Sequence, residues 1–238
     1  MKAQESMIKK FAFTLAEVLI TLGIIGIIAE LTIPALIDSA DKAEYVAGLR
    51  KTYSVLSQAQ LQVAGDAGGS FQDSLSGLDA DSSTSNDVFA NLFAQKMNVV
   101  KTCPSTDTTN TCFVDSYRTL DNYVTPGWTG LSSFIAKDGT AYSFILRSPD
   151  CAADPTSTYP IDRSICGEVL IDVNGPNRGP AKVGRDIFAL WVNKNGVYPS
   201  EEGHPQDEID EWCSKGTHPL SSGWTCATKV LNEGAMNY

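Results

Sequence analysis

The 238-residue sequence has little positive charge and few histidines. It carries 18 Lys and Arg against 28 Asp and Glu, for a formal net charge of −10, and it has two histidines. Proteins that coat nucleic acids neutralise phosphates with Lys and Arg, so this composition argues against a nucleic-acid partner.

Several motifs typical of enzymes are also missing. The sequence has no G-x-S-x-G motif, no Gly-Lys-Ser/Thr after its glycine-rich stretch at residues 65–69, and no cysteine in a recognisable nucleophile setting. We therefore expect no catalytic residues and no enzymatic activity. No two cysteines have CxxC spacing, and a zinc site from His204, Cys213, His218 and Cys226 is disfavoured by its irregular spacing.

The six cysteines form an even set that follows the most apolar part of the chain. Taken as sequential pairs, they enclose three short loops: Cys103 with Cys112, Cys151 with Cys166, and Cys213 with Cys226. Six cysteines allow many connectivities, and we favour these three local disulfides, formed in an oxidising compartment.

Residues 13–37, FTLAEVLITLGIIGIIAELTIPALI, form a run long and apolar enough to cross a bilayer, yet Glu17 lies near its start. A charge inside a membrane helix costs about 2.5–3.5 kcal/mol on insertion scales, so Glu17 should have a partner. Residues 1–12 are polar and carry three lysines, which predicts that they stay in the cytoplasm while the rest faces outward. The apolar run is not followed by a clear A-x-A-like signal-peptidase site.

A cut between Ala12 and Phe13 would supply the missing partner. It would turn the backbone nitrogen of Phe13 into a free α-amine, one helical turn from Glu17 and on the same helix face. The two charges could then pair within one chain or between neighbouring chains.

The run KKFAFTLAEVLITLGIIGIIAELTIPALI resembles the leader and N-terminal helix of type IV pilins and type II secretion pseudopilins. The resemblance implies that prepilin peptidase cuts between Ala12 and Phe13, and that Phe13 is then N-methylated. It also implies that Glu17 is the assembly carboxylate and that Pro34 kinks the helix. Ala12 stands where the family usually has Gly.

By this resemblance the protein is a structural subunit of a type IV pilus or a type II secretion-like filament. Its partners would be copies of itself or other pilins in a helical homo- or hetero-filament, prepilin peptidase and an inner-membrane assembly platform. It would cross the bacterial cytoplasmic membrane once, with its head outside, and then enter a cell-surface or periplasm-spanning filament. The alternative is a signal-anchored surface binding module that does not polymerise.

These patterns divide the chain into a leader at residues 1–12, a membrane or filament-core half-helix at 13–37, an amphipathic half-helix at 38–64 and a globular head at 65–238. Within the head, SNDVFANLFAQKM predicts a short helix that buries Val88, Leu92 and Phe93.

Strand patterns dominate the rest of the head. FIAKDGTAYSFIL predicts a hairpin around Asp138-Gly139, and GEVLIDVNG and GRDIFALWV predict two further strands. We therefore expect an α+β fold, with a long N-terminal helix packed on an antiparallel sheet of about four strands and disulfide-bounded loops. The pilin fold has the same layout.

The segment DVNGPNRGPAKVGRD carries the only cofactor prediction. Asp172, Asn174 and Asn177 offer oxygen ligands at short spacing, and Asp186 could complete a calcium site. The segment lacks the full EF-hand pattern, and Asx-turn chemistry alone explains Asp-x-Asn-Gly, so we favour a structural loop over calcium. Major pseudopilins bind calcium in a loop of their sheet, which keeps calcium open as the alternative.

Overall fold

The computed structural model describes residues 14–106, 111–127 and 131–238. The predicted cleavage and methylation positions, Ala12 and Phe13, lie outside these residues. The chain divides into two compact units, Met1–Asp41 and Lys42–Tyr238. Helix α1, Leu15–Asp66, begins in the first unit and ends in the second.

The first part of α1 is the apolar helix that the sequence predicts. By length and composition it could cross a membrane. Its large apolar side chains are exposed, from 42% at Val18 to 79% at Leu15. Pro34 lies inside α1, which is helical on both sides of it.

The second part of α1, residues 42–66, packs in the second unit. Its buried side chains recur every three or four residues, as one face of an amphipathic helix requires. They belong to the main hydrophobic core: Tyr45, Val46, Leu49, Leu56, Ala59 and Val63. Beyond Asp66 the chain turns through Gly68 and Gly69, whose φ angles of 82° and 107° favour glycine.

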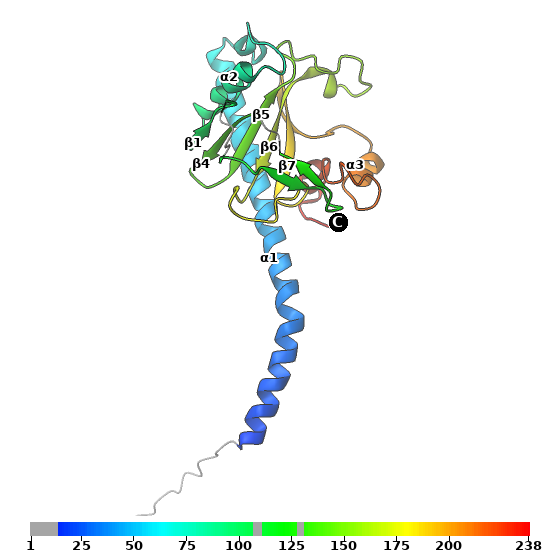
Figure 1. Cartoon of the computed structure of the whole chain (residues 1–238). Coiled ribbons are helices and arrows are strands. Elements are labelled where there is room, and N and C mark those ends of the chain that lie inside the picture. The colour runs from blue at the N-terminus through cyan, green and yellow to red at the C-terminus, as the bar shows by residue number, and fades with distance from the viewer. Residues whose placement is uncertain (1–13, 107–110, 128–130) are drawn as a thin grey trace, which may run out of the picture. The chain divides into compact units, whose positions relative to one another are not determined.

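A six-stranded antiparallel sheet forms the centre of the second unit (Figure 1). Its order is β1 (Val99–Cys103), β4 (Ser132–Ala136), β5 (Ala141–Leu146), β6 (Ile165–Asp172), β7 (Ile187–Asn193) and β8 (Gly196–Pro199). The predicted hairpin is confirmed as β4 and β5, and the two further strands as β6 and β7. The expected number of about four strands was too low, because β1 and β8 extend both edges.

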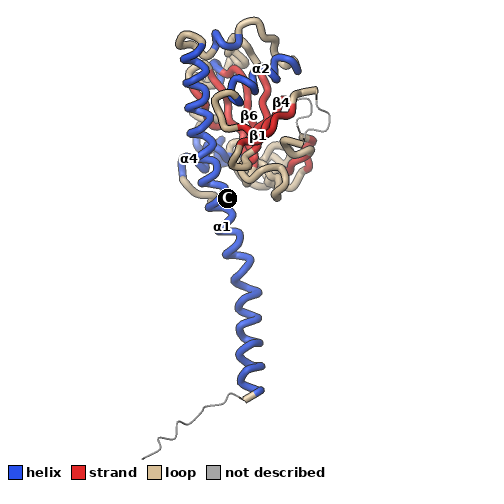
Figure 2. The backbone as a smooth tube through the Cα atoms, turned by 90° about the vertical axis from the view of Figure 1, so that its left-hand side faces the viewer, coloured by secondary structure: helices blue, strands red, loops and turns tan. Residues whose placement is uncertain are grey.

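One face of the sheet packs against helices. Phe144, Val169 and Leu190 lie in register on neighbouring strands and are fully buried. Helix α2, Ser83–Ala94, places Phe93 on Phe144 with ring centroids 5.0 Å apart. Figure 2 shows α1 and α2 beside the strands. Helix α4, Cys226–Glu233, adds further side chains to the same core.

The opposite face of the sheet is also covered. Leu170 and Ala189 pack there with Tyr117 and Val183, which come from outside the sheet. Tyr117 belongs to β2 (Ser116–Arg118), which pairs with β3 (Val124–Pro126) in a separate two-stranded sheet. Because both faces are covered, every residue of β5 is buried. The fold is therefore α+β.

Helix α2 corrects one detail of the predicted core. Val88 is 40% exposed, whereas Phe89 and Phe93 are fully buried. Leu92 is partly buried against the core. The buried face of α2 therefore contains Phe89 in place of the predicted Val88. Phe89 and Phe93 are four residues apart, so they lie on the same helix face and both pack on the sheet.

Three disulfides stabilise the loops of the second unit. Cys103 pairs with Cys112, Cys151 with Cys166, and Cys213 with Cys226. All three favoured sequential pairs are therefore confirmed. The Cys213–Cys226 disulfide joins the end of α3 (Gln206–Trp212) to α4. Short 3-10 helices occur at Gln72–Leu75 and Asp162–Ser164.

Candidate functional site

The start of α1 gives Glu17 a local partner. The Thr14 backbone N–H and hydroxyl both donate to Glu17 Oε2 at 2.8 Å, and the Glu17 N–H donates to the Thr14 hydroxyl at 3.2 Å. This reciprocal arrangement is a capping box, which satisfies backbone donors that the first helical turn leaves unpaired. Glu17 therefore has a structural role at the helix start, next to its predicted role in assembly.

The exposed apolar side chains of α1 form a continuous surface in the first unit, which we call the apolar segment (residues 15–37). Thirteen large apolar residues in this segment are among the exposed ones of the protein. Exposed apolar patches of this extent mark surfaces that contact lipid or other proteins. Glu17 and Glu30 are the acidic residues within it.

The predicted calcium ligands lie on the loop that connects β6 to β7. Asp172 ends β6 and is opposite Ile187, the first residue of β7. Its Oδ1 accepts the backbone N–H groups of Asn174 at 3.3 Å and Gly175 at 2.9 Å. These bonds form the Asx turn that the sequence favours, and the φ of 86° at Gly175 suits glycine.

Asp186 closes the same loop from its other end. Its Oδ2 accepts the Ala181 N–H at 2.8 Å and its Oδ1 accepts the Lys182 N–H at 2.7 Å. Asp172 and Asp186 are both fully buried. Burial raises the pKa of both carboxyls, and the charge of Asp186 helps to raise that of Asp172 to about 7.

The donor chemistry at Asp172 suits a hard cation. Asp172 Oδ2 and Asn174 Oδ1 are buried and have no hydrogen-bond partner within the described residues. Calcium prefers several oxygen ligands of this kind. Asn177, however, lies on the exposed part of the loop, and both Asp186 oxygens already accept backbone N–H groups. Calcium at this loop stays a prediction, centred on Asp172 and Asn174.

The β6–β7 loop is tied to the buried half of α1. Arg178 pairs with Glu44 at 2.9 Å, and the Tyr45 hydroxyl donates to the Gly179 carbonyl at 3.5 Å. A Cβ at Gly48 would lie 3.1 Å from Val173 Cβ, so the helix and the loop approach closely here. A change in this loop would therefore act directly on α1.

The C-terminal region contains the residues of the zinc site that the sequence disfavours. Cys213 and Cys226 are bonded to each other, which removes them as zinc ligands. His218 stacks on Trp212 with ring centroids 3.9 Å apart and pairs with Glu211 at 3.0 Å. His204 lies in a different cluster, with Asp162 and Glu201, that no sequence motif indicates.

The structure thus brings together two groups of polar side chains in the second unit and leaves an apolar helix surface exposed in the first. The structure gives Glu17 a partner in Thr14 and leaves one side-chain oxygen each of Asp172 and Asn174 without a partner within the described residues. The predicted cleavage and methylation positions, Ala12 and Phe13, lie outside those residues. Comparison with protein-family models, with curated protein sequences and with solved structures finds no match to this chain.

Proposed function

We propose that the protein is a structural subunit of a type IV pilus or a type II secretion-like filament, of the pilin or pseudopilin type. The observation that carries the proposal is the exposed apolar segment of α1 with Glu17 at its start. The motif around Ala12 and Phe13 supports it, as does the α+β second unit with its disulfides. In this proposal the chain is a substrate of the processing enzymes and catalyses no reaction itself.

The apolar segment needs a partner because its exposure to water is unfavourable. Burying apolar surface contributes about 25 cal/mol per Å², and thirteen large side chains supply that surface. Lipid can cover them in a single membrane-inserted chain. Helices of neighbouring subunits can cover them in a filament, so the same surface serves both proposed stages.

Glu17 distinguishes the two stages. Lipid offers a carboxylate no cationic partner, whereas a neighbouring processed chain would offer the α-amine of Phe13. A pair formed only in the correct axial position favours that position over misplaced ones, because a misplaced chain lacks this charge pair. We therefore assign register selection to Glu17.

The proposal also assigns a location and a set of partners. The chain would first cross the cytoplasmic membrane once, with its second unit outside, where an oxidising environment allows disulfide formation. Prepilin peptidase, an inner-membrane assembly platform and other pilin-type subunits would be its partners. Its net charge of −10 argues against a nucleic-acid partner.

Peptide mass spectrometry of the protein from native cells, with prepilin peptidase present and absent, tests processing directly. We expect a mature chain that begins at N-methylated Phe13 when the peptidase is present. A chain that still carries residues 1–12 in peptidase-positive cells would contradict the proposal and favour a signal-anchored module.

Assembly is tested by Glu17→Ala, with Glu30→Ala as the matched control from the same helix. We expect both variants to insert into the membrane, and Glu17→Ala alone to lose most of its filaments in sheared-surface and electron-microscopy assays. Normal filaments from Glu17→Ala would contradict the proposed role of this carboxylate.

A further inference from the structure

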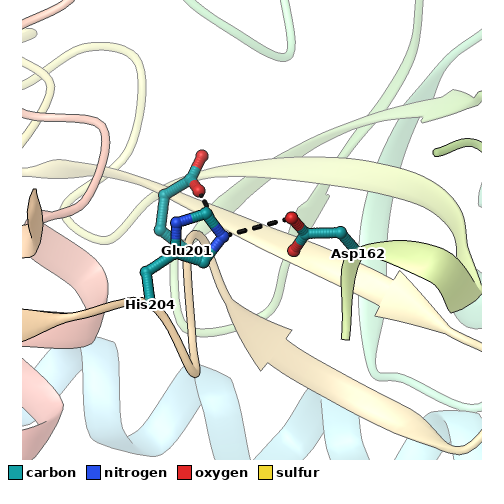
Figure 3. A group of neighbouring side chains, drawn as sticks. All are labelled: Asp162, Glu201 and His204. Atoms are coloured by element: carbon teal, nitrogen blue, oxygen red, sulfur yellow. Dashed lines mark hydrogen bonds and ion pairs between the residues drawn. The ribbon is translucent and has the colours of Figure 1, made fainter. Parts of the chain in front are cut away.

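Four side chains around one imidazole form a polar cluster in the second unit. We define this His204 cluster as Asp162, Glu201, His204 and Glu208. His204 Nε2 lies 2.9 Å from Glu201 Oε2 and 3.1 Å from Asp162 Oδ2, and its Nδ1 lies 3.2 Å from Glu208 Oε2. Figure 3 shows Asp162 and Glu201 approaching the same edge of the ring.

The cluster contains more negative charge than one histidine can neutralise. Within the described residues, the ion pairs of Asp162 and Glu201 are both with His204. One imidazolium carries a single positive charge, whereas three carboxylates surround it.

The hydrogen bond at Nδ1 determines what Nε2 can do. With Nδ1–H donated to Glu208, a neutral imidazole turns its Nε2 lone pair toward two carboxylate oxygens. Three electron-rich atoms then face one another, and either a proton on Nε2 or a metal ion between them stabilises this arrangement. A histidine whose other nitrogen donates to a carboxylate is the common arrangement at metal sites, because this bond fixes the tautomer and orients the ring.

The imidazole is held in this orientation by its neighbours. The Tyr159 ring lies on it with ring centroids 3.6 Å apart, and the Trp191 ring meets it edge-on at 6.4 Å. The Tyr159 hydroxyl donates to Glu208 at 3.0 Å, which also positions the carboxylate that accepts from Nδ1.

Asp162 has one buried carboxylate oxygen without a hydrogen-bond partner. It is only 8% exposed, and its Oδ1 is buried without a hydrogen-bond partner within the described residues. Its Oδ2 accepts from Ser157 at 2.7 Å, so the carboxylate is held in place while one oxygen stays unsatisfied. A buried oxygen without a partner is costly, and a metal ion bound by both oxygens of Asp162 would remove that cost.

We propose that Asp162, Glu201 and His204 bind a divalent transition-metal ion, with Zn²⁺ as the ion that fits best. One ligand atom from each residue lies within 4.8 Å of the others. Ligand atoms of a tetrahedral zinc site are about 3.3 Å apart, given metal–ligand distances of about 2.0–2.2 Å, so small side-chain movements suffice. An imidazole favours zinc over calcium or magnesium, which prefer ligand sets made of oxygens alone.

Three protein ligands leave a fourth position for water or an anionic group. A cavity of about 540 Å³ adjoins the cluster and is lined by Glu201, His204 and Glu208 together with Trp191, Trp212 and Trp224. Because Glu201 and His204 belong to both the site and the lining of this cavity, we expect a fourth ligand to reach the ion from it. The ion would also link the 3-10 helix at Asp162–Ser164 to the segment before α3, which are far apart in sequence.

Isothermal titration calorimetry of the full chain with Zn²⁺ tests the site. The protein is used in detergent micelles, with its disulfides intact, after treatment with a chelator. We expect one high-affinity Zn²⁺ per chain that millimolar Ca²⁺ does not displace, and a higher thermal unfolding midpoint with Zn²⁺. Absence of tight Zn²⁺ binding, or displacement by Ca²⁺, would overturn the assignment.

His204→Ala should weaken Zn²⁺ binding by at least about 100-fold, whereas His218→Ala should leave it unchanged. His218 is a matched control because it also pairs with a carboxylate, Glu211, and stacks on a tryptophan. Glu208→Gln should weaken Zn²⁺ binding by about 10-fold, because Glu208 accepts the hydrogen bond from Nδ1 that orients the His204 ring. Equal binding by wild type and His204→Ala would refute the site.

Asp162→Asn provides a second variant that keeps the size of the side chain and an acceptor for Ser157. We expect it to keep the near-ultraviolet circular dichroism of the wild type and to lose Zn²⁺ affinity by at least 10-fold. A folded Asp162→Asn protein with unchanged affinity would contradict its role as a ligand. The site is independent of filament assembly, so failure of either proposal leaves the other intact.

Discussion

Replacing Asp172 with Asn should stabilise the protein above pH 7 in the absence of calcium. Asp172 is fully buried, and its pKa is raised from 3.8 to about 7 by burial and by the charge of Asp186. At about 1.36 kcal/mol per pKa unit, full ionisation of Asp172 lowers the unfolding free energy by at most about 4 kcal/mol. Asn keeps the side-chain oxygen that forms the Asx turn with Asn174 and Gly175 and carries no charge.

The pH dependence has a defined sign. A carboxyl whose folded pKa is raised contributes its full stability below the unfolded pKa, near 4, and loses it as the pH rises through about 7. Wild-type stability should therefore fall across this window relative to Asp172→Asn. Urea unfolding of the full chain in detergent micelles, followed by tryptophan fluorescence at pH 4.5 and pH 8 with chelator, measures the difference.

Calcium provides the second arm of the experiment. If calcium binds at Asp172 and Asn174, adding it at pH 8 should stabilise the wild type and leave Asp172→Asn unchanged. If Asp172→Asn is less stable than the wild type at pH 8 with chelator, the carboxylate is favourably ionised in the fold. That result would refute the reasoning from burial.

Two further predictions concern the core and the disulfides. Gly167→Ala should lower the unfolding free energy by about 1–3 kcal/mol, because the new Cβ would overlap the Ile145 carbonyl and lie 2.7 Å from the Phe89 ring. An unchanged urea midpoint would contradict this packing. Replacing Cys151 and Cys166 together by Ala should cost about 3 kcal/mol, because the disulfide closes a loop of 15 residues. A loss below 1 kcal/mol in the same assay would contradict that value.

The sequence predicted the helices, the hairpin and the disulfides whose patterns lie within short stretches of neighbouring residues. The long helix α1 follows from its uninterrupted apolar and then amphipathic periodicity. The β4–β5 hairpin follows from Asp138-Gly139, where glycine adopts a φ of 92°. The sequential disulfides follow from short spacing, since a short loop brings its two ends together at low entropic cost.

The edge strands were missed because their signals are weaker. Strand β8 is only four residues long and includes a proline, which is typical of an edge strand. It pairs with β7 across the turn at residues 194–195, where Asn195-Gly196 was the available signal. The buried face of α2 was misplaced by one residue because hydrophobicity alone did not separate Val88 from Phe89.

The His204 cluster could not be predicted from sequence spacing. His204 and Glu208 are four residues apart, but Asp162 comes from a separate segment that precedes β6. The fold brings these segments together. The side-chain amide of Asn193, at the end of β7, donates to the Ile161 carbonyl at 2.6 Å and holds the segment that carries Asp162 in place. A long-range contact of this kind depends on the fold, so one sequence gives no periodic signal for it.

The capping box at Thr14 changes the energetic argument for assembly through Glu17. Within the described residues both Thr14 donors use Oε2, so the carboxylate is partly satisfied before any neighbour arrives. In the proposed filament, a Phe13 amine can approach Oε1 without breaking the cap. The gain from docking is then one charge pair added to an intact helix start, rather than the rescue of an unpaired charge. Thr14→Ala should therefore weaken the start of α1 while leaving the carboxylate available, whereas Glu17→Ala removes the helix cap and the docking group together.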